Sequence, residues 1–74
     1  MNDNIREHME VVGSDGATIG KVDHVQGTEI KLTKSSDKSD QHHFIPLDWV
    51  ANVDTKVHLS KAARDAKAQW RAAA

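Results

Sequence analysis

The chain has 74 residues, with 10 Lys or Arg, 11 Asp or Glu and no cysteine. A chain of this length forms one domain with a thin core, because it buries only about 60% of the surface that its unfolded form exposes. The near-neutral charge argues against nucleic acid and anionic membranes as partners, since both bind basic surfaces. The lack of cysteine excludes disulfides and thiolate chemistry, and no apolar run has the length of a signal sequence or membrane span. We therefore expect a soluble, cytoplasmic protein.

The N-terminal part predicts a polar arm followed by two strands. Residues 1–8 are mostly polar and predict a flexible arm. The segment MEVVGSDGATIGKVDHV is typical of strand, turn and strand, with Ser14-Asp15-Gly16 as the turn. Apolar residues then recur every three positions from Ile19 to Val25, and Gly20 lies within this run. A glycine at such a place often marks a bulge, so we expect the second strand to bend sharply.

The middle of the chain predicts four more strands, two of them in a hairpin, and one exposed loop. Apolar and polar residues alternate in TEIKLT, which is typical of a half-buried strand. Residues 34–41 contain no apolar side chain and predict an exposed loop. HHFIPL is extended, and Pro46 marks the end of a strand or an edge. ANVDTKVHLS predicts a final hairpin with Asp54-Thr55 at its tip.

Residues 61–74 are rich in alanine and predict a C-terminal α-helix with Ser60 as its N-cap. Ala63, Ala66 and Trp70 share one face of this helix. A helix of about 12 residues is marginal alone, so it needs a surface to dock on. The sequence leaves open whether that surface belongs to its own domain or to a partner.

The order of four segments resembles the PRC-barrel superfamily: MEVVGSDGATIGKVDHV, IKL, HHFIPLDWV and KVHLS. More closely, the chain is similar to a family of short bacterial proteins of unknown function. The resemblance runs from about Ile5 to Ser60, and the matching positions are fold residues: Asp15, Gly16, Gly20, Val22, Ile45, Pro46 and Leu47. It implies a mainly β domain over residues 9–60, a small and highly bent antiparallel β-barrel of five to six short strands, followed by the helix. It also implies an adaptor that docks on another protein.

Histidine is enriched, with five in the chain: His8, His24, His42, His43 and His58. Imidazole is the commonest metal ligand, yet a metal site needs at least three converging ligands. Adjacent strand residues point to opposite faces, so His42 and His43 cannot easily bind one ion. We therefore expect histidines at the surface or the rim of the barrel, with no metal and no other cofactor. The alternative is a site of His24, His42 and His58, formed if their strands pair.

We expect no catalytic residue in this chain. Its serines fall in turns and loops, without a base beside them in the sequence pattern. A barrel of this size is filled by its own side chains and leaves little room for a substrate pocket.

The remaining feature is a set of aromatic residues. If Ile45 and Leu47 point inward, strand alternation turns Phe44 outward beside His42. Phe and Trp are typical interface anchors, so the candidate interaction residues are Phe44, His42, Trp49 and Trp70. We predict a non-catalytic protein-interaction or self-association module, a homodimer or small homo-oligomer. The alternative is a histidine-based metal-binding or pH-responsive small protein.

Overall fold

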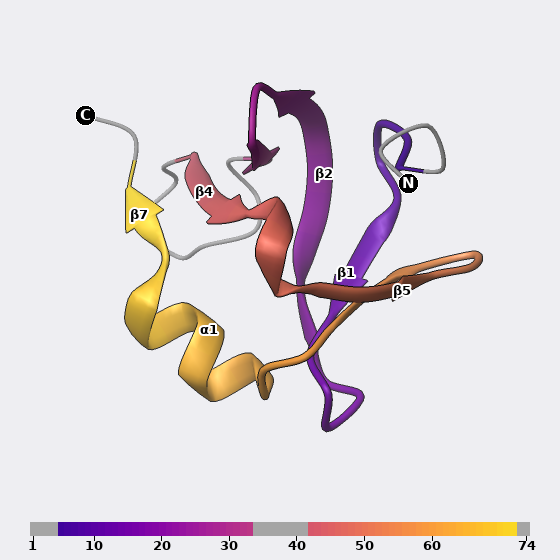
Figure 1. The fold of residues 1–74 in the computed structure, drawn as a ribbon, viewed down its shortest axis with the longest axis vertical. Helices are drawn as coiled ribbons and strands as arrows, with labels where there is room; N and C mark the ends of the chain where they lie inside the picture. The colour runs from indigo at the N-terminus through magenta and orange to yellow at the C-terminus, as the bar shows by residue number, and fades with distance from the viewer. Residues whose placement is uncertain (1–4, 34–41, 73–74) are drawn as a thin grey trace.

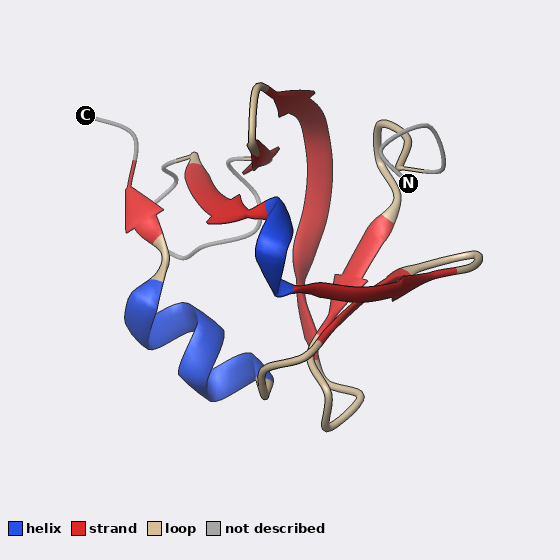
Figure 2. Cartoon of the chain, viewed as in Figure 1, coloured by secondary structure: helices blue, strands red, loops and turns tan. Residues whose placement is uncertain are grey.

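The structure is a computed structural model that describes residues 5–33 and 42–72. The strands within these ranges are β1 (Glu10–Val12), β2 (Thr18–Gln26), β3 (Glu29–Leu32), β4 (His43–Pro46), β5 (Val50–Val53), β6 (Val57–Leu59) and β7 (Arg71–Ala72). A 3₁₀ turn, Leu47–Trp49, joins β4 to β5, and α1 (Ala63–Gln69) lies between β6 and β7. Figures 1 and 2 show the hairpin of β5 and β6 projecting to the side of the molecule away from α1.

The strands form one mixed sheet in the order β5-β6-β1-β2-β3-β4-β7. β1 and β6 pair in parallel, whereas the other five pairs are antiparallel. Within the described residues the sheet is open, with β5 and β7 at its edges. The prediction of a mainly β fold with a C-terminal helix is confirmed. The prediction of a purely antiparallel sheet is wrong, because β6 returns beside β1 in the same direction and local hairpin patterns do not reveal that pairing.

β2 is bent by two extra residues. Ile19 is extra where β2 pairs with β1, and Asp23 is extra where β2 pairs with β3. Each such bulge kinks the strand and increases its twist. The bulges explain the spacing of three between apolar residues, since Ile19 and Val22 are buried and Val25 packs against the core. The predicted bend beside Gly20 is confirmed.

The turn between β1 and β2 also follows the prediction. The Asp15 carboxylate accepts a hydrogen bond from the Ala17 N–H, and Gly16 has a φ of 85°. That φ is open to glycine and strained for most other residues. Gly13, just before the turn, is needed for another reason: a Cβ there would lie 2.3 Å from the Ala63 nitrogen. Gly13 thus allows the start of α1 to approach the sheet.

The core joins the inner side of the sheet to α1. Its fully or nearly fully buried members are Val11, Ile19, Val22, Ile30, Leu32, Ile45, Val57, Leu59, Ala63 and Ala66. The predicted inward face of the helix is confirmed by the two alanines, and Trp70 packs against the same cluster. No helix in the described part of the chain is long and apolar enough to cross a membrane.

The helix is shorter than predicted. It begins at Ala63 with Ala62 as its N-cap, and it ends at Gln69. Ser60 is not the N-cap, because its N–H and hydroxyl both donate to the Trp49 carbonyl beside β5. Trp70 leaves the helix in an extended conformation, since the residues after it pair with β4. The predicted range of 61–74 is therefore wrong at both ends.

Two predicted segments lie partly or wholly outside the described residues. These are residues 1–4 of the predicted arm and the predicted exposed loop at 34–41. The rest of the arm is held on the sheet, because Ile5 packs against the core and the His8 N–H donates to the Val22 carbonyl.

Candidate functional site

β4 contains Phe44, the residue that the sequence placed at the centre of an interface. Side chains on both faces of this strand are buried. The exposed fractions are 5% for His43, 8% for Phe44 and 0% for Ile45. Ile45 belongs to the core cluster and Phe44 does not, as strand alternation predicts. The predicted exposure of Phe44 is nevertheless wrong.

Phe44 is buried because β7 brings Arg71 over it. Arg71 lies opposite Phe44 in the pairing of β4 with β7. Its guanidinium carbon is 4.4 Å from the centre of the Phe44 ring, within the range of a cation–π contact. Arg71 Nη2 also lies 2.5 Å from Glu29 Oε1 on β3. The alanine-rich sequence around Arg71 favours helix, so this short strand could not be foreseen.

The other predicted interaction residues have partners within the chain. The Trp70 ring stacks on the His43 ring, with centroids 4.0 Å apart. Trp49 is half-buried, and the Lys61 ammonium lies 5.3 Å from its ring centre. His42 Nδ1 donates to the Leu32 carbonyl at 2.8 Å. The helix therefore docks on its own sheet.

The histidines of the alternative metal set lie apart, each beside a different partner. His24 contacts Asp23 and Gln26, while His58 Nε2 lies 2.8 Å from Asp54 Oδ1. Among residues 5–33 and 42–72, no group of three His, Cys, Asp or Glu side chains is arranged to hold a metal ion. The structure thus does not bring His24, His42 and His58 together. The expectation of surface or rim histidines is wrong for His43, which is 5% exposed and stacks on Trp70.

The open edge at β5 is the surface that sequence reasoning missed. Among the strands of residues 5–33 and 42–72, β5 pairs with β6 on one side and lies at the end of the sheet on the other. Ala51 and Asn52 are exposed, and the strand Val50–Val53 contains no charge and no proline. A register shift between Val50 and Asn52 is its one irregularity. Natural edge strands are usually protected by charged side chains, proline, shortness or bulges, so the protection of β5 comes from its bulge and its modest length alone.

The opposite edge of the sheet is better protected. β7 has two residues, and one of them is Arg71, which is held by Glu29 and Phe44. A short, charged edge offers little to a further strand. Within the described part of the chain the two ends of the sheet therefore differ, and β5 is the less protected end.

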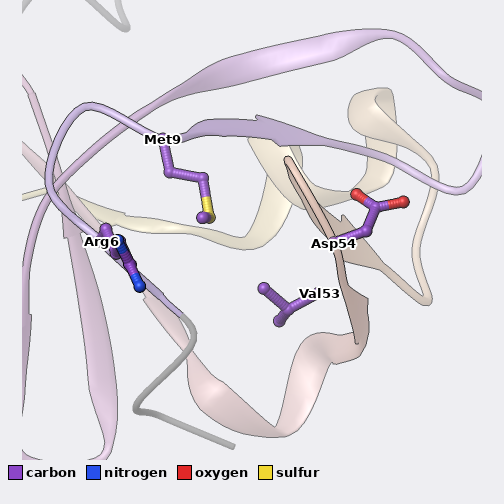
Figure 3. A pocket seen from close by; sticks show the side chains of 4 residues that line it. All are labelled: Arg6, Met9, Val53 and Asp54. Atoms are coloured by element: carbon purple, nitrogen blue, oxygen red, sulfur yellow. The ribbon is translucent and has the colours of Figure 1, made fainter.

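A hollow of about 450 Å³ lies beside the C-terminal end of β5. It is lined by Arg6, Met9, Val53 and Asp54, so the segment before β1 forms one wall and the end of β5 the other. Figure 3 shows the Met9 and Val53 side chains facing one another across it, with Arg6 and Asp54 at its sides. Its lining is more polar than apolar, since Arg6 and Asp54 contribute one charge of each sign beside the Met9 and Val53 side chains. No sequence pattern joins residues so far apart, which is why this hollow was not predicted.

Two hydrogen bonds between Asp54 and Lys56 stabilise the turn of the β5–β6 hairpin. The Asp54 N–H donates to the Lys56 carbonyl, and the Lys56 N–H donates to the Asp54 carboxylate. The Lys56 N–H, followed by the His58 ring, lowers the pKa of the Asp54 carboxyl. The Thr18 hydroxyl, aided by Lys56, lowers the pKa of the Glu10 carboxyl. Both carboxylates are therefore ionised near neutral pH, where these hydrogen bonds and the contact of Lys56 with Glu10 are present.

Comparison with known proteins places the chain in a family. No curated protein matches it significantly. Residues 5–67 match the family described as "Uncharacterized protein conserved in bacteria (DUF2171)". The matched range runs from the end of the N-terminal segment into α1, and so includes the strands β1 to β6. Because the match covers well over half of the chain, the protein belongs to this DUF2171 family of bacterial proteins.

Proposed function

We propose that the chain is a non-catalytic protein-interaction module that associates with itself, as a homodimer or small homo-oligomer, in the cytoplasm. The observation that carries this proposal is the edge of β5, which is exposed and free of charge and proline. An edge strand offers a row of backbone N–H and C=O groups that a further strand can pair with. Addition of a strand to an edge is a common mode of protein recognition.

The fold supports grouping the module with the PRC-barrel type. The two bulges in β2 and the strong bend they cause are what a short sheet needs in order to curl. The order of segments from MEVVGSDGATIGKVDHV to KVHLS points the same way. Fold alone does not determine function, so the proposed role depends on the β5 edge.

The proposed self-association contact lies at the edge of β5 and not at Phe44. Phe44 is 8% exposed and lies beneath Arg71. A residue covered in this way contributes to the stability of the monomer and offers little area to a partner. Asn52 and Ala51, in contrast, are exposed on a strand with an open side.

Light scattering across a range of concentrations tests the proposal. We expect the mass to rise above the 8.2 kDa of the monomer. A four-residue edge buries less than the roughly 1,200–2,000 Å² of stable interfaces, so the range should extend to about 1 mM, where binding is worth about 4 kcal/mol. A mass of one monomer throughout would overturn the proposal.

A matched pair of variants locates the contact. Ala51→Lys places a charge on the exposed edge of β5 and should reduce the mass to that of the monomer. Ala68→Lys adds the same charge at an exposed position of α1 and should leave the mass unchanged. Equal effects of the two substitutions would mean that the contact lies elsewhere.

A further inference from the structure

We infer that the edge of β4 is a second interaction site, which takes an extended segment of another protein with an aromatic residue followed by a basic one. The chain's own residues 70–72 cover this site as a displaceable strap. The site consists of Glu29 on β3 together with His43 and Phe44 on β4, and we call it the β4 edge site. The inference goes beyond the proposed function, because this site lies at the opposite end of the sheet from β5.

The strap shows how the β4 edge site recognises a segment. Its backbone pairs antiparallel with β4, with Arg71 opposite Phe44 and Ala72 opposite His43. The Trp70 ring stacks on the His43 ring, with centroids 4.0 Å apart and planes at 17°. Backbone pairing combined with separate contacts for successive side chains is how a sheet edge recognises an extended peptide.

The two side-chain contacts lie on opposite faces of β4, since neighbouring strand residues point to opposite sides. On the Phe44 face, the Arg71 guanidinium carbon is 4.4 Å from the ring centre, and Arg71 Nη2 is 2.5 Å from Glu29 Oε1. On the His43 face, Trp70 packs against the core cluster. An aromatic ring thus fits one face and a cation the other, where the Glu29 carboxylate repels an acidic residue in the same place.

The strap is lightly held. β7 has two residues and pairs with β4 at two positions. The Arg71 side chain is 59% exposed, so its pair with Glu29 contributes little to stability. Segments with few buried contacts open at a low free-energy cost.

The family match points to the same boundary. It ends at residue 67, before the strap, so β4 is the end strand of the sheet within the matched part of the chain. The strap therefore leaves β4 without separating any pair of strands among β1 to β6.

Binding of a labelled peptide, AQWRA (the sequence of residues 68–72), tests the inference by fluorescence anisotropy. Trp70→Ala combined with Arg71→Ala removes both side-chain contacts and leaves alanines, which favour helix over strand. This uncovered variant should bind the peptide about tenfold more tightly than the wild type, because a closed site lowers the apparent affinity by the fraction that is open. A folded uncovered variant that binds no better than the wild type would overturn the inference.

A charge reversal tests the role of Glu29. Glu29→Arg in the uncovered variant should abolish binding of AQWRA and create binding of AQWEA, in which glutamate replaces the arginine. The uncovered variant with Glu29 intact should show the reverse preference. A preference that does not change with Glu29→Arg would mean that the peptide binds elsewhere.

Two further variants serve as controls. Arg64→Ala removes a cation from an exposed position of α1 and should leave peptide affinity at the wild-type value. Near-UV circular dichroism and melting check the fold, since Trp70 packs against the core. If the double variant does not fold, Arg71→Glu keeps Trp70 in place, sets a carboxylate beside Glu29 and should still raise affinity for AQWRA.

Light scattering of the same variants separates this inference from self-association at β5. If the wild type associates and the uncovered variant is monomeric, the occupant of the β4 edge site is the strap of a second copy, which would overturn a separate partner. Failure of peptide binding would leave the β5 proposal standing. A monomeric wild type with a peptide-binding uncovered variant would overturn the β5 proposal alone.

Discussion

Asp15 links the turn between β1 and β2 to the start of α1. Its Oδ1 accepts hydrogen bonds from the backbone N–H groups of Ala17 and Ala63, both at 3.2 Å. Ala62 at the N-cap has no side-chain oxygen, so Asp15 satisfies an N–H group that the helix leaves without a partner. The bond from Ala63, followed by that from Ala17, lowers the pKa of the Asp15 carboxyl. A residue that the sequence identifies only as a turn former thus also holds the helix.

Asp15→Ala should lower the Tm by several degrees at neutral pH, because two N–H groups lose their acceptor. Since the folded pKa is depressed, this contribution is complete above the unfolded value of about 3.8 and is lost as pH falls through the folded pKa. The gap in Tm between wild type and variant should therefore narrow in acid, as thermal melts between about pH 7 and about pH 2 would measure. Asp15→Asn, which keeps an acceptor, should lose less. A gap independent of pH would contradict the assignment.

Phe44 is a structural residue of the monomer. Phe44→Ala should lower the free energy of unfolding by about 3 kcal/mol, because it leaves a cavity between β4 and Arg71. Arg71→Gln removes the cation–π contact and the pair with Glu29, yet should cost no more than about 1 kcal/mol because Arg71 is largely exposed. Urea unfolding followed by Trp fluorescence measures both. A Phe44→Ala cost as small as that of Arg71→Gln would mean that Phe44 is not a packing residue.

The sequence pattern predicts which face of β4 each residue occupies. It does not predict how exposed each side chain is. Alternation put Ile45 inside and Phe44 on the other face, and both placements are correct. Whether that other face is covered depends on Arg71, which lies far along the chain on β7. Local periodicity contains no information about such a contact.

At the scale of elements, the docking of α1 depends on close approach to the strand ends. α1 has seven residues, too few to be stable alone, and it buries Ala63 and Ala66 against the sheet. Gly13 leaves room for the Ala63 backbone, where any side chain would collide. Helix and turn are therefore fitted to one another.

Gly13→Ala should lower the free energy of unfolding by about 1–3 kcal/mol, since the backbone of α1 must move away. The displacement should also reduce the stacking of Trp70 on His43, which near-UV circular dichroism and fluorescence would register. Gly16→Asn is the matched control, because a Cβ there meets nothing within 4 Å and Asn tolerates positive φ. If Gly13→Ala were as mild as Gly16→Asn, the tight contact would be wrong.

Helices and strands that depend on a local sequence pattern were predictable. Those that depend on pairing with residues far away in the chain were not. The bent β2, the alternating β3 and the Pro46 strand end follow from spacing, bulge glycine and proline geometry. β7 and the early end of α1 do not, because pairing with β4 overrides the helix propensity of alanine. The parallel pairing of β1 with β6 likewise joins segments from opposite ends of the domain.

The described residues form one open sheet, and its β7 end is better protected than its β5 end. β7 and Arg71 close one end, while β5 offers an uncharged strand beside a hollow. Self-association remains our proposal. The proposed contact surface is the edge of β5 and not Phe44, which is buried. The edge of a sheet is a property of strand order, which no local pattern in this chain reveals.

Amide hydrogen exchange of β5 as a function of protein concentration tests the assignment of the contact most directly. If a second copy pairs with the edge of β5, the amides of Val50–Val53 should exchange progressively more slowly as concentration rises, while those of α1 keep their rates. Exchange at Val50–Val53 that is the same at every concentration, in a sample that nevertheless associates, would contradict the central claim that β5 is the contact.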